Sequence, residues 1–125
     1  MSNVPANLKY TKDHEWLSIE GDIATVGITD YAQESLGDLV FVELPKVGAK
    51  FEGGKDMVIV ESCKAASDVY APVAGEVVEI NDNVVNTPDT INTDPYANGW
   101  LVKLKISPAD VANLLDAEAY KKLLD

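Results

Sequence analysis

A lysine stands between two apolar, β-rich segments near the middle of the chain. The run from Val58 to Glu61 leads into residues 62–66, which are small apart from Lys64, and a second β-rich run begins at Val69. This pattern predicts a β-hairpin with Lys64 at its exposed turn. Two interpretations follow: the lysine is a solubilising turn residue, or its small neighbours leave the amine accessible for covalent attachment of an arm.

Two other side chains could carry chemistry. Cys63 is the only cysteine in the sequence, and His14 is the only histidine. One thiol cannot form an intrachain disulfide, and the pair is too small for the usual zinc sites, which combine several Cys and His ligands. Cys63 lies near Glu61 and Asp68, which do not activate a thiol. A catalytic Cys–His dyad would require the fold to bring the two residues together, and nothing local indicates that.

The charge balance disfavours several classes of partner. Acidic residues number 21 against 10 basic ones, all of them lysine, for a formal net charge of −11. Such a surface repels nucleic-acid and lipid phosphates, and without arginine it lacks a bidentate phosphate-binding group. No signal or transit peptide is visible, and no apolar run could span a bilayer. We expect a cytoplasmic protein whose acidic surface either steers docking to basic partners or provides solubility alone.

The elements that position Lys64 are expected to be mostly strands. At 125 residues the chain has the size of one domain, and we expect residues 1–125 to form it. The dipeptide Gly21-Asp22 predicts another hairpin, and many short β-rich runs at close spacing indicate a barrel or sandwich. The expected strands are Trp16–Ile19, Ile23–Ile28, Leu39–Leu44, Met57–Val60, Val69–Ala71, Gly75–Ile80 and Leu101–Ile106.

Two helices interrupt this pattern. One is expected over Asp30–Leu36, capped by Thr29 or Asp30 and stopped by Gly37. The other is expected from about Pro108 to Leu124, because a capping serine precedes the proline and apolar residues then recur at every fourth position. The polar stretch 81–99 is predicted as a long loop, either a functional or a plain surface connection.

Several blocks of sequence along the whole chain form a recognisable set. The blocks are Tyr10 with His14-Glu15-Trp16, Gly27 to Gln33, Leu36-Gly37-Asp38, Phe41 to Pro45, Glu61 to Val77, Ile91-Asn92, Asp94-Pro95-Tyr96 and Gly99-Trp100-Leu101. In order and spacing they resemble the glycine cleavage system H proteins, and the block around Lys64 is similar to that family's lipoyl-lysine hairpin. Cys63 stands where we expect valine in the family.

The resemblance implies a fold, a cofactor and a role. The fold would be mainly β, the barrel-sandwich hybrid of lipoyl and biotinyl carriers, with a short helix and a C-terminal helix. The cofactor would be lipoic acid in amide linkage to Lys64. The role would be that of a non-catalytic carrier, which takes an aminomethyl group from the P protein, glycine decarboxylase, to the T protein, aminomethyltransferase. The L protein, dihydrolipoamide dehydrogenase, would reoxidise the reduced arm.

The resemblance also assigns recognition residues. Glu61 and Gly75 would help a lipoylating enzyme, a further partner, to recognise Lys64. Gly75 has a second, purely structural interpretation, a tight turn between the residues on either side of it.

The family's arm cleft maps to four more positions. Glu15, Ile28 and Asp68 would hold the loaded arm, and Ser35 occupies a position that is often histidine in relatives. Ile28 offers apolar contact, while Glu15 and Asp68 can accept charge-assisted hydrogen bonds from the arm's ammonium. Alternatively, the two acids are solvated turn residues.

Other classes of protein fit less well or remain open. A biotinyl domain typically has methionine on both sides of its lysine, whereas Lys64 lies between Cys63 and Ala65. The lipoyl domain of a 2-oxoacid dehydrogenase usually has Asp-Lys-Ala and belongs to a longer chain. A relay that donates lipoyl groups to other enzymes is compatible with the same residues. An enzyme in its own right is disfavoured because no catalytic constellation is present.

Overall fold

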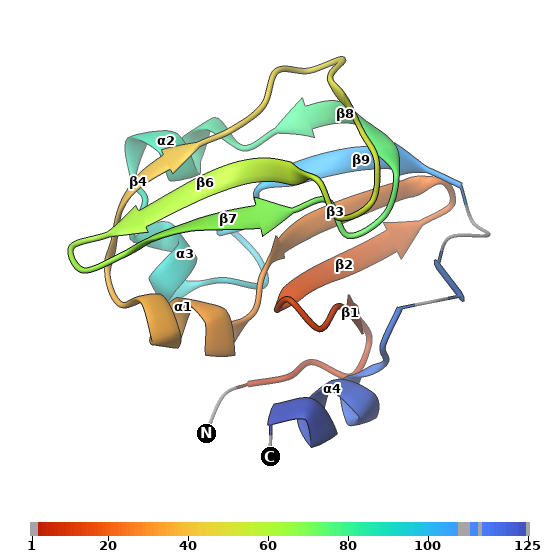
Figure 1. The fold of residues 1–125 in the computed structure, drawn as a ribbon, viewed down its shortest axis with the longest axis horizontal. Helices are drawn as coiled ribbons and strands as arrows, with labels where there is room; N and C mark the ends of the chain where they lie inside the picture. Colours follow the sequence, from red (N-terminus) through yellow and green to blue (C-terminus); the bar gives the residue numbers. More distant parts are fainter. Residues whose placement is uncertain (1–2, 108–110, 113, 125) are drawn as a thin grey trace.

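Antiparallel strands in two sheets form the framework of the structure, a computed structural model that describes residues 3–107, 111–112 and 114–124 (Figure 1). One sheet has six strands in the order β1-β2-β3-β9-β8-β5, and a second has three in the order β4-β6-β7. The strands are β1 (Lys9–Tyr10), β2 (Glu15–Glu20), β3 (Ile23–Ile28), β4 (Leu39–Glu43), β5 (Lys50–Phe51), β6 (Asp56–Ser62), β7 (Ala66–Tyr70), β8 (Gly75–Ile80) and β9 (Val102–Ile106). The helices are α1 (Asp30–Leu36), α2 (Asp82–Asn86), α3 (Thr90–Thr93) and α4 (Ala117–Leu124).

The two sheets enclose the main hydrophobic core. Side chains alternate along a strand, so every second residue of β6 and β7 can face this core. Val58, Val60 and Val69 do so and are almost completely buried. From the larger sheet, Leu17 and Leu104 belong to the same cluster. The strands that lead to Lys64 are therefore anchored in the core of the protein.

The predicted turn between β2 and β3 and the predicted start and end of α1 are confirmed. Gly21 adopts a left-handed φ of 63° in the tight turn between the two strands, which pair from Glu15 to Ile28. Thr29 caps α1, its Oγ1 accepting the N–H of Ala32 at 3.3 Å. Gly37 ends the helix with a φ of 85°, a conformation that favours glycine.

The predicted loop over residues 81–99 contains two short helices. The side chain of Asn81 caps α2 by accepting the N–H of Asn83 at 3.2 Å. Val84 and Ile91 are completely buried and anchor α2 and α3 on the main core. The large aliphatic residues of this polar stretch, Val84, Val85 and Ile91, are too few to show the periodicity that would predict these helices.

The C-terminal helix is shorter than predicted. It begins at Ala117, and residues 108–110, where we placed its first turn, lie outside the described residues. Leu115 forms an antiparallel bridge to Tyr10, with N–H to carbonyl distances of 2.8 Å in both directions. Pairing with the edge strand β1 therefore replaces helical hydrogen bonding at this position.

A second, smaller core lies between β1, β2 and α4. Leu8, Tyr10, Trp16, Ala117 and Tyr120 form it. The rings of Tyr10 and Tyr120 stack at a centroid distance of 4.8 Å with an interplanar angle of 9°. This packing holds the C-terminal helix below the larger sheet, near the N-terminal end of the chain (Figure 1).

Candidate functional site

The β6–β7 hairpin presents Lys64 at its turn, as the sequence predicted. The two strands pair from Asp56 and Tyr70 at the base to Glu61 and Ala66 near the turn. The turn projects beyond the ends of the other strands on the side of α1 (Figure 1). We call residues 62–66 the hairpin tip.

Ser62 organises the hairpin tip. Its backbone N–H donates to the carbonyl of Ala65 at 2.7 Å. Its hydroxyl accepts the backbone N–H groups of Lys64 at 3.3 Å and Ala65 at 3.1 Å. The backbone of Lys64 is thus held by bonds that a short polar side chain makes within its own turn.

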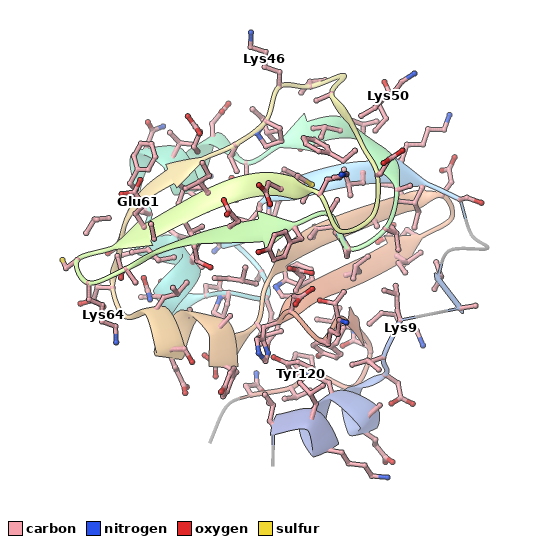
Figure 2. The ribbon with its side chains drawn as sticks, viewed as in Figure 1. Lys9, Lys46, Lys50, Glu61, Lys64 and Tyr120 are labelled. Carbon is pink, nitrogen blue, oxygen red and sulfur yellow. The ribbon has the colours of Figure 1, made fainter. Side chains whose placement is uncertain are left out.

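The side chain of Lys64 is exposed and lies on the side of the hairpin that faces α1 (Figure 2). Its Cε lies 3.5 Å from the position that a Cβ would occupy on Gly37, the residue that ends α1. The amine is therefore open to solvent while the aliphatic part of the side chain rests against the end of a helix.

Glu61 lies in β6, directly before the hairpin tip. It is half-buried, and its strand partners are Phe41 on β4 and Ala66 on β7. Its position, three residues before Lys64 and on the same hairpin, is suited to contact with an enzyme that approaches the tip.

Gly75 is required by close packing in a strand, so the interpretation as a tight turn is wrong. It begins β8 and pairs with Phe51 and Ile106. A Cβ at this position would lie 2.9 Å from the carbonyl oxygen of Lys105 and 3.2 Å from Cβ of Leu104. The backbone of β9 leaves no room for a side chain there.

Glu15 is a buried carboxylic acid and not a solvated turn residue. Its exposed fraction is 2%. Thr11 Oγ1 donates to its Oε1 at 2.7 Å, and the N–H of Tyr70 donates to its Oε2 at 3.3 Å. It borders a cavity of about 490 Å³ that is also lined by Tyr10, Pro72 and Leu115, among others. Glu15 thus connects the start of β2 with the base of the β6–β7 hairpin.

Burial changes the acidity of Glu15. Loss of solvation raises its pKa from 4.5 to about 7, and the negative charge of Asp13 adds to this rise. The hydrogen bonds from Thr11 and Tyr70 oppose the rise without cancelling it. A cation brought next to this carboxyl group would favour its ionised form, because it would restore the stabilisation that burial removes.

The other predicted cleft residues occupy different surroundings. Ile28 is the strand partner of Glu15, but it is 3% exposed and belongs to the main core. Asp68 is exposed and borders a second cavity, of about 320 Å³, together with Glu43. Ser35 is exposed on α1. The structure brings Glu15 and Ile28 together, and the cavity bordered by Glu15 includes neither Asp68 nor Ser35.

A group of polar and aromatic residues beside Glu15 was not predicted from the sequence. Tyr120 Oη lies 2.8 Å from His14 Nδ1 and 2.7 Å from Thr29 Oγ1, so α4 is joined to the residue before β2 and to the N-cap of α1. Burial lowers the pKa of His14 and raises that of Tyr120 to about 12. We call Tyr10, His14, Thr29 and Tyr120 the tyrosine cluster. The block Tyr10 with His14-Glu15-Trp16 hinted at it, but its link to residue 120 requires the fold.

The described part of the chain lacks two kinds of feature. Within it, no helix is long and apolar enough to cross a membrane. Over the same residues, no group of three or more His, Cys, Asp and Glu side chains could hold a metal ion.

Comparison with known proteins gives one consistent result. The family model described as glycine cleavage H-protein matches residues 8–125. Glycine cleavage system H proteins of Escherichia coli O7:K1 and Klebsiella pneumoniae are each 57% identical to this chain over 127 residues, covering 100% of it and 98% of each relative. A crystal structure of a glycine cleavage system H protein from Mycobacterium marinum matches with a TM-score of 0.87 and 46% identity, over 95% of this chain and 97% of that one. The expected fold, mainly β with a short and a C-terminal helix, is thereby confirmed, and the chain belongs to the glycine cleavage H-protein family.

Proposed function

We propose that this chain carries a lipoyl group on Lys64 and shuttles an aminomethyl group between the P and T proteins of the glycine cleavage system. Membership of the family makes the chain a carrier component of that system. In the finer proposal the chain is one non-catalytic carrier domain, and the L protein reoxidises its reduced arm. The enzymes provide the catalysis, and the carrier provides reach and presentation.

The observation that carries the proposal is the setting of Lys64. The residue is exposed at a turn whose flanking strands are anchored by buried valines. A rigid hairpin holds the point of attachment still, so that the motion of an attached arm begins at the side chain and not at a mobile loop. Cys63, Ala65 and Ala66 are small and exposed, and they leave the amine open to a modifying enzyme.

These residues fit a covalently bound lipoyl group. An exposed primary amine on a rigid turn can form an amide with a carboxylic acid, which is the linkage that lipoate requires. When bound, the lipoyl group would supply a disulfide whose S–S bond is reduced as one sulfur takes the aminomethyl group, and which is reoxidised after the group has been passed on. The chain's own contribution is to hold the amide at a fixed point and to offer surfaces against which the arm can rest.

Glu15 is suited to hold the loaded end of the arm. It is buried, hydrogen-bonded and next to a cavity of about 490 Å³ at the base of the same hairpin. An ammonium group in that cavity would form a charge-assisted hydrogen bond with the ionised carboxylate. Asp68 and Ser35 lie on exposed surface, and Ile28 is in the core, so Glu15 has the strongest structural support of the four cleft residues.

The test of the proposal is the intact mass of the chain after incubation with a lipoate–protein ligase, ATP and lipoate. The parent should gain one lipoyl increment, and Lys64→Ala should gain none. Lys46→Ala is the matched control, because Lys46 is also exposed but points away from the hairpin tip (Figure 2). Retention of the increment in Lys64→Ala would refute the assignment of the attachment site.

A further inference from the structure

Asn92 uses its whole side-chain amide to bind the corner where α1 ends and β4 begins. Its Nδ2 donates to Gln33 Oε1 and to the carbonyl of Gly37, both at 2.9 Å. Its Oδ1 accepts the N–H of Leu39, also at 2.9 Å. The partners are a helix residue, the residue that ends the helix and the first residue of the next strand. One side chain from α3 therefore fixes the direction in which the chain leaves α1.

The corner depends on this support. A helix leaves its last carbonyl groups without partners in the helix. Among the described residues, β4 is an edge strand that pairs with β6 alone, so one side of its backbone has no neighbouring strand there. Asn92 donates to the carbonyl of Gly37 and accepts the N–H of Leu39, so it gives hydrogen-bond partners to the backbone at the end of α1 and at the start of β4.

Two short routes lead from this corner to Lys64. Leu39 is the strand partner of Ser62, whose hydroxyl holds the backbone N–H of Lys64. Gly37 is the residue against which Cε of Lys64 lies. Asn92 binds both Leu39 and Gly37, so it supports the backbone and the side chain of Lys64 through separate contacts.

Electrostatics favours the same resting place. α1 has no basic residue in its last turn. The C-terminal end of a helix carries partial negative charge and is stabilised by a nearby cation. Lys64 brings an ammonium group to this end from the hairpin tip (Figure 2). The corner held by Asn92 is therefore a platform for the unmodified lysine.

We propose that Asn92 is a positioning residue for acylation of Lys64. The inference rests on the proposed function, in which Lys64 accepts the lipoyl group. In that step the unprotonated amine attacks the carboxyl carbon of a lipoyl adenylate made from lipoate and ATP. The N–C bond forms, the C–O bond to AMP breaks, and the amine loses a proton to solvent. Asn92 touches none of these atoms and acts by holding the surface on which the side chain of Lys64 rests.

The test compares the kinetics of lipoylation of Asn92→Ala with those of the parent, using the full chain, a lipoate–protein ligase, ATP and lipoate. Initial rates are followed by intact mass at several concentrations of the chain. Because loss of orientation affects the chemical step more than the encounter, we expect kcat to fall about ten-fold while KM for the chain changes by less than about two-fold.

Asn81→Ala is a matched control. The Nδ2 of Asn81 donates to two main-chain carbonyl groups, at 2.8 and 2.7 Å, and its Oδ1 accepts the N–H of Asn83. The residue is buried, and its bonds join it to Asn83, Asn98 and Trp100, none of which contributes to the corner. Its loss should cost a similar set of hydrogen bonds and leave kcat of lipoylation within about two-fold of the parent.

Asn92→Asp keeps the test decisive if Asn92→Ala does not fold. Asp preserves the size of the side chain and the acceptor for Leu39, but it removes both donors and turns an oxygen toward the carbonyl of Gly37. We expect its kcat to fall as in Asn92→Ala. A kcat within about two-fold of the parent in the folded Asn92 variants, or an equal fall in Asn81→Ala, would overturn the positioning role. Absence of lipoylation in the parent would instead refute the proposed function.

Discussion

The hairpin tip and the tyrosine cluster are ordered in opposite ways. At the tip, the hydroxyl of Ser62 and the backbone of Ala65 make the bonds that shape the turn, and Lys64 remains outside. In the cluster, Tyr120 joins segments 106 and 91 residues away in the sequence, at His14 and Thr29. The turn at the tip is therefore shaped mainly by bonds among its own residues and rests on the nearby α1–β4 corner, whereas the cluster joins segments that meet only when the whole chain has folded.

The two regions differ in what they do for a side chain: the tip exposes the amine of Lys64, and the surroundings of the cluster bury the carboxyl group of Glu15. An exposed amine at the tip can be reached by a modifying enzyme, and few contacts must break when it reacts. The carboxyl group of Glu15, beside the cluster, is kept from water by residues of several elements, which raises its pKa to about 7. We therefore expect substitutions at the tip to alter modification with little effect on stability, and substitutions at the cluster to do the reverse.

The largest expected effect is on stability, from Tyr120→Ala. Tyr120 is completely buried, stacks on Tyr10 and bonds to two other segments through its hydroxyl group. Its truncation leaves a cavity and removes the link that docks α4, so the free energy of unfolding should fall by about 3–5 kcal/mol. Denaturant titration followed by tryptophan fluorescence measures this, since Trp16 lies in the same small core.

Leu123→Ala is the control on the same helix. Leu123 is 45% exposed, and its truncation should change the free energy of unfolding by less than about 0.5 kcal/mol. Under conditions where both variants are folded, Lys64 should be lipoylated at the rate of the parent. A slow reaction in folded Tyr120→Ala would contradict the separation of the two regions.

The features that depend on neighbouring residues in the chain could be predicted from the sequence. The turn around Lys64 and the start and end of α1 depend on neighbours in the chain, namely small residues, the capping Thr29 and Gly37. Local patterns of this kind were sufficient to predict them. The family resemblance located Glu61 and Glu15, but only the structure distinguished a buried Glu15 from a solvated turn acid.

The parts that sequence analysis missed depend on partners far along the chain. β1 and β5 have two residues each, too few for any periodicity, and become strands by pairing with β2 and β8. The C-terminal helix was extended too far because the bridge between Leu115 and Tyr10 cannot be read from local spacing. Asn92 lies in a recognised block, yet its contact with the α1–β4 corner has no signature in the sequence.

A smaller effect is expected from Glu15→Gln, and it depends on pH. The folded chain keeps a proton on Glu15 up to about pH 7, whereas the unfolded chain releases it near its ordinary pKa of 4.5. Between these values the folded state binds more protons, so this group makes the free energy of unfolding fall as pH rises. Glutamine cannot titrate, so between about pH 4.5 and 7 the free energy of unfolding of the variant should fall less than that of the parent, by up to about 3 kcal/mol. Thermal or urea unfolding at several pH values measures the slope.

Asp68→Asn is the matched control for Glu15→Gln. It also removes one carboxylate, but from an exposed position, so it controls for the loss of one negative charge. Equal slopes in the parent and Glu15→Gln would contradict the burial argument.

The same Glu15 variant, once lipoylated and loaded with an aminomethyl group, should release ammonia faster than the parent in the absence of T protein. Release at the parent's rate would show that Glu15 does not shelter the arm.

The smallest effect on stability is expected from Ser62→Ala at the hairpin tip. The substitution removes the acceptor of the N–H groups of Lys64 and Ala65, both exposed, which can bond to water instead. The free energy of unfolding should therefore fall by less than about 1 kcal/mol. The backbone of Lys64 would nevertheless lose a fixed direction, so lipoylation should slow by about three-fold, and amide exchange should accelerate at Lys64 and Ala65.

Ser67→Ala is the matched control for Ser62→Ala, because it removes a serine hydroxyl from the same hairpin. Ser67 is half-buried on β7, opposite Val60, and lies beyond the turn. Its truncation should leave the exchange of the Lys64 and Ala65 amides and the rate of lipoylation unchanged. If Ser62→Ala unfolds as readily as Tyr120→Ala, the tip is coupled to the rest of the fold and the two regions are not independent. If it exchanges and reacts like the parent, the turn is shaped by the strands alone, and the bonds of Ser62 do not position the lysine.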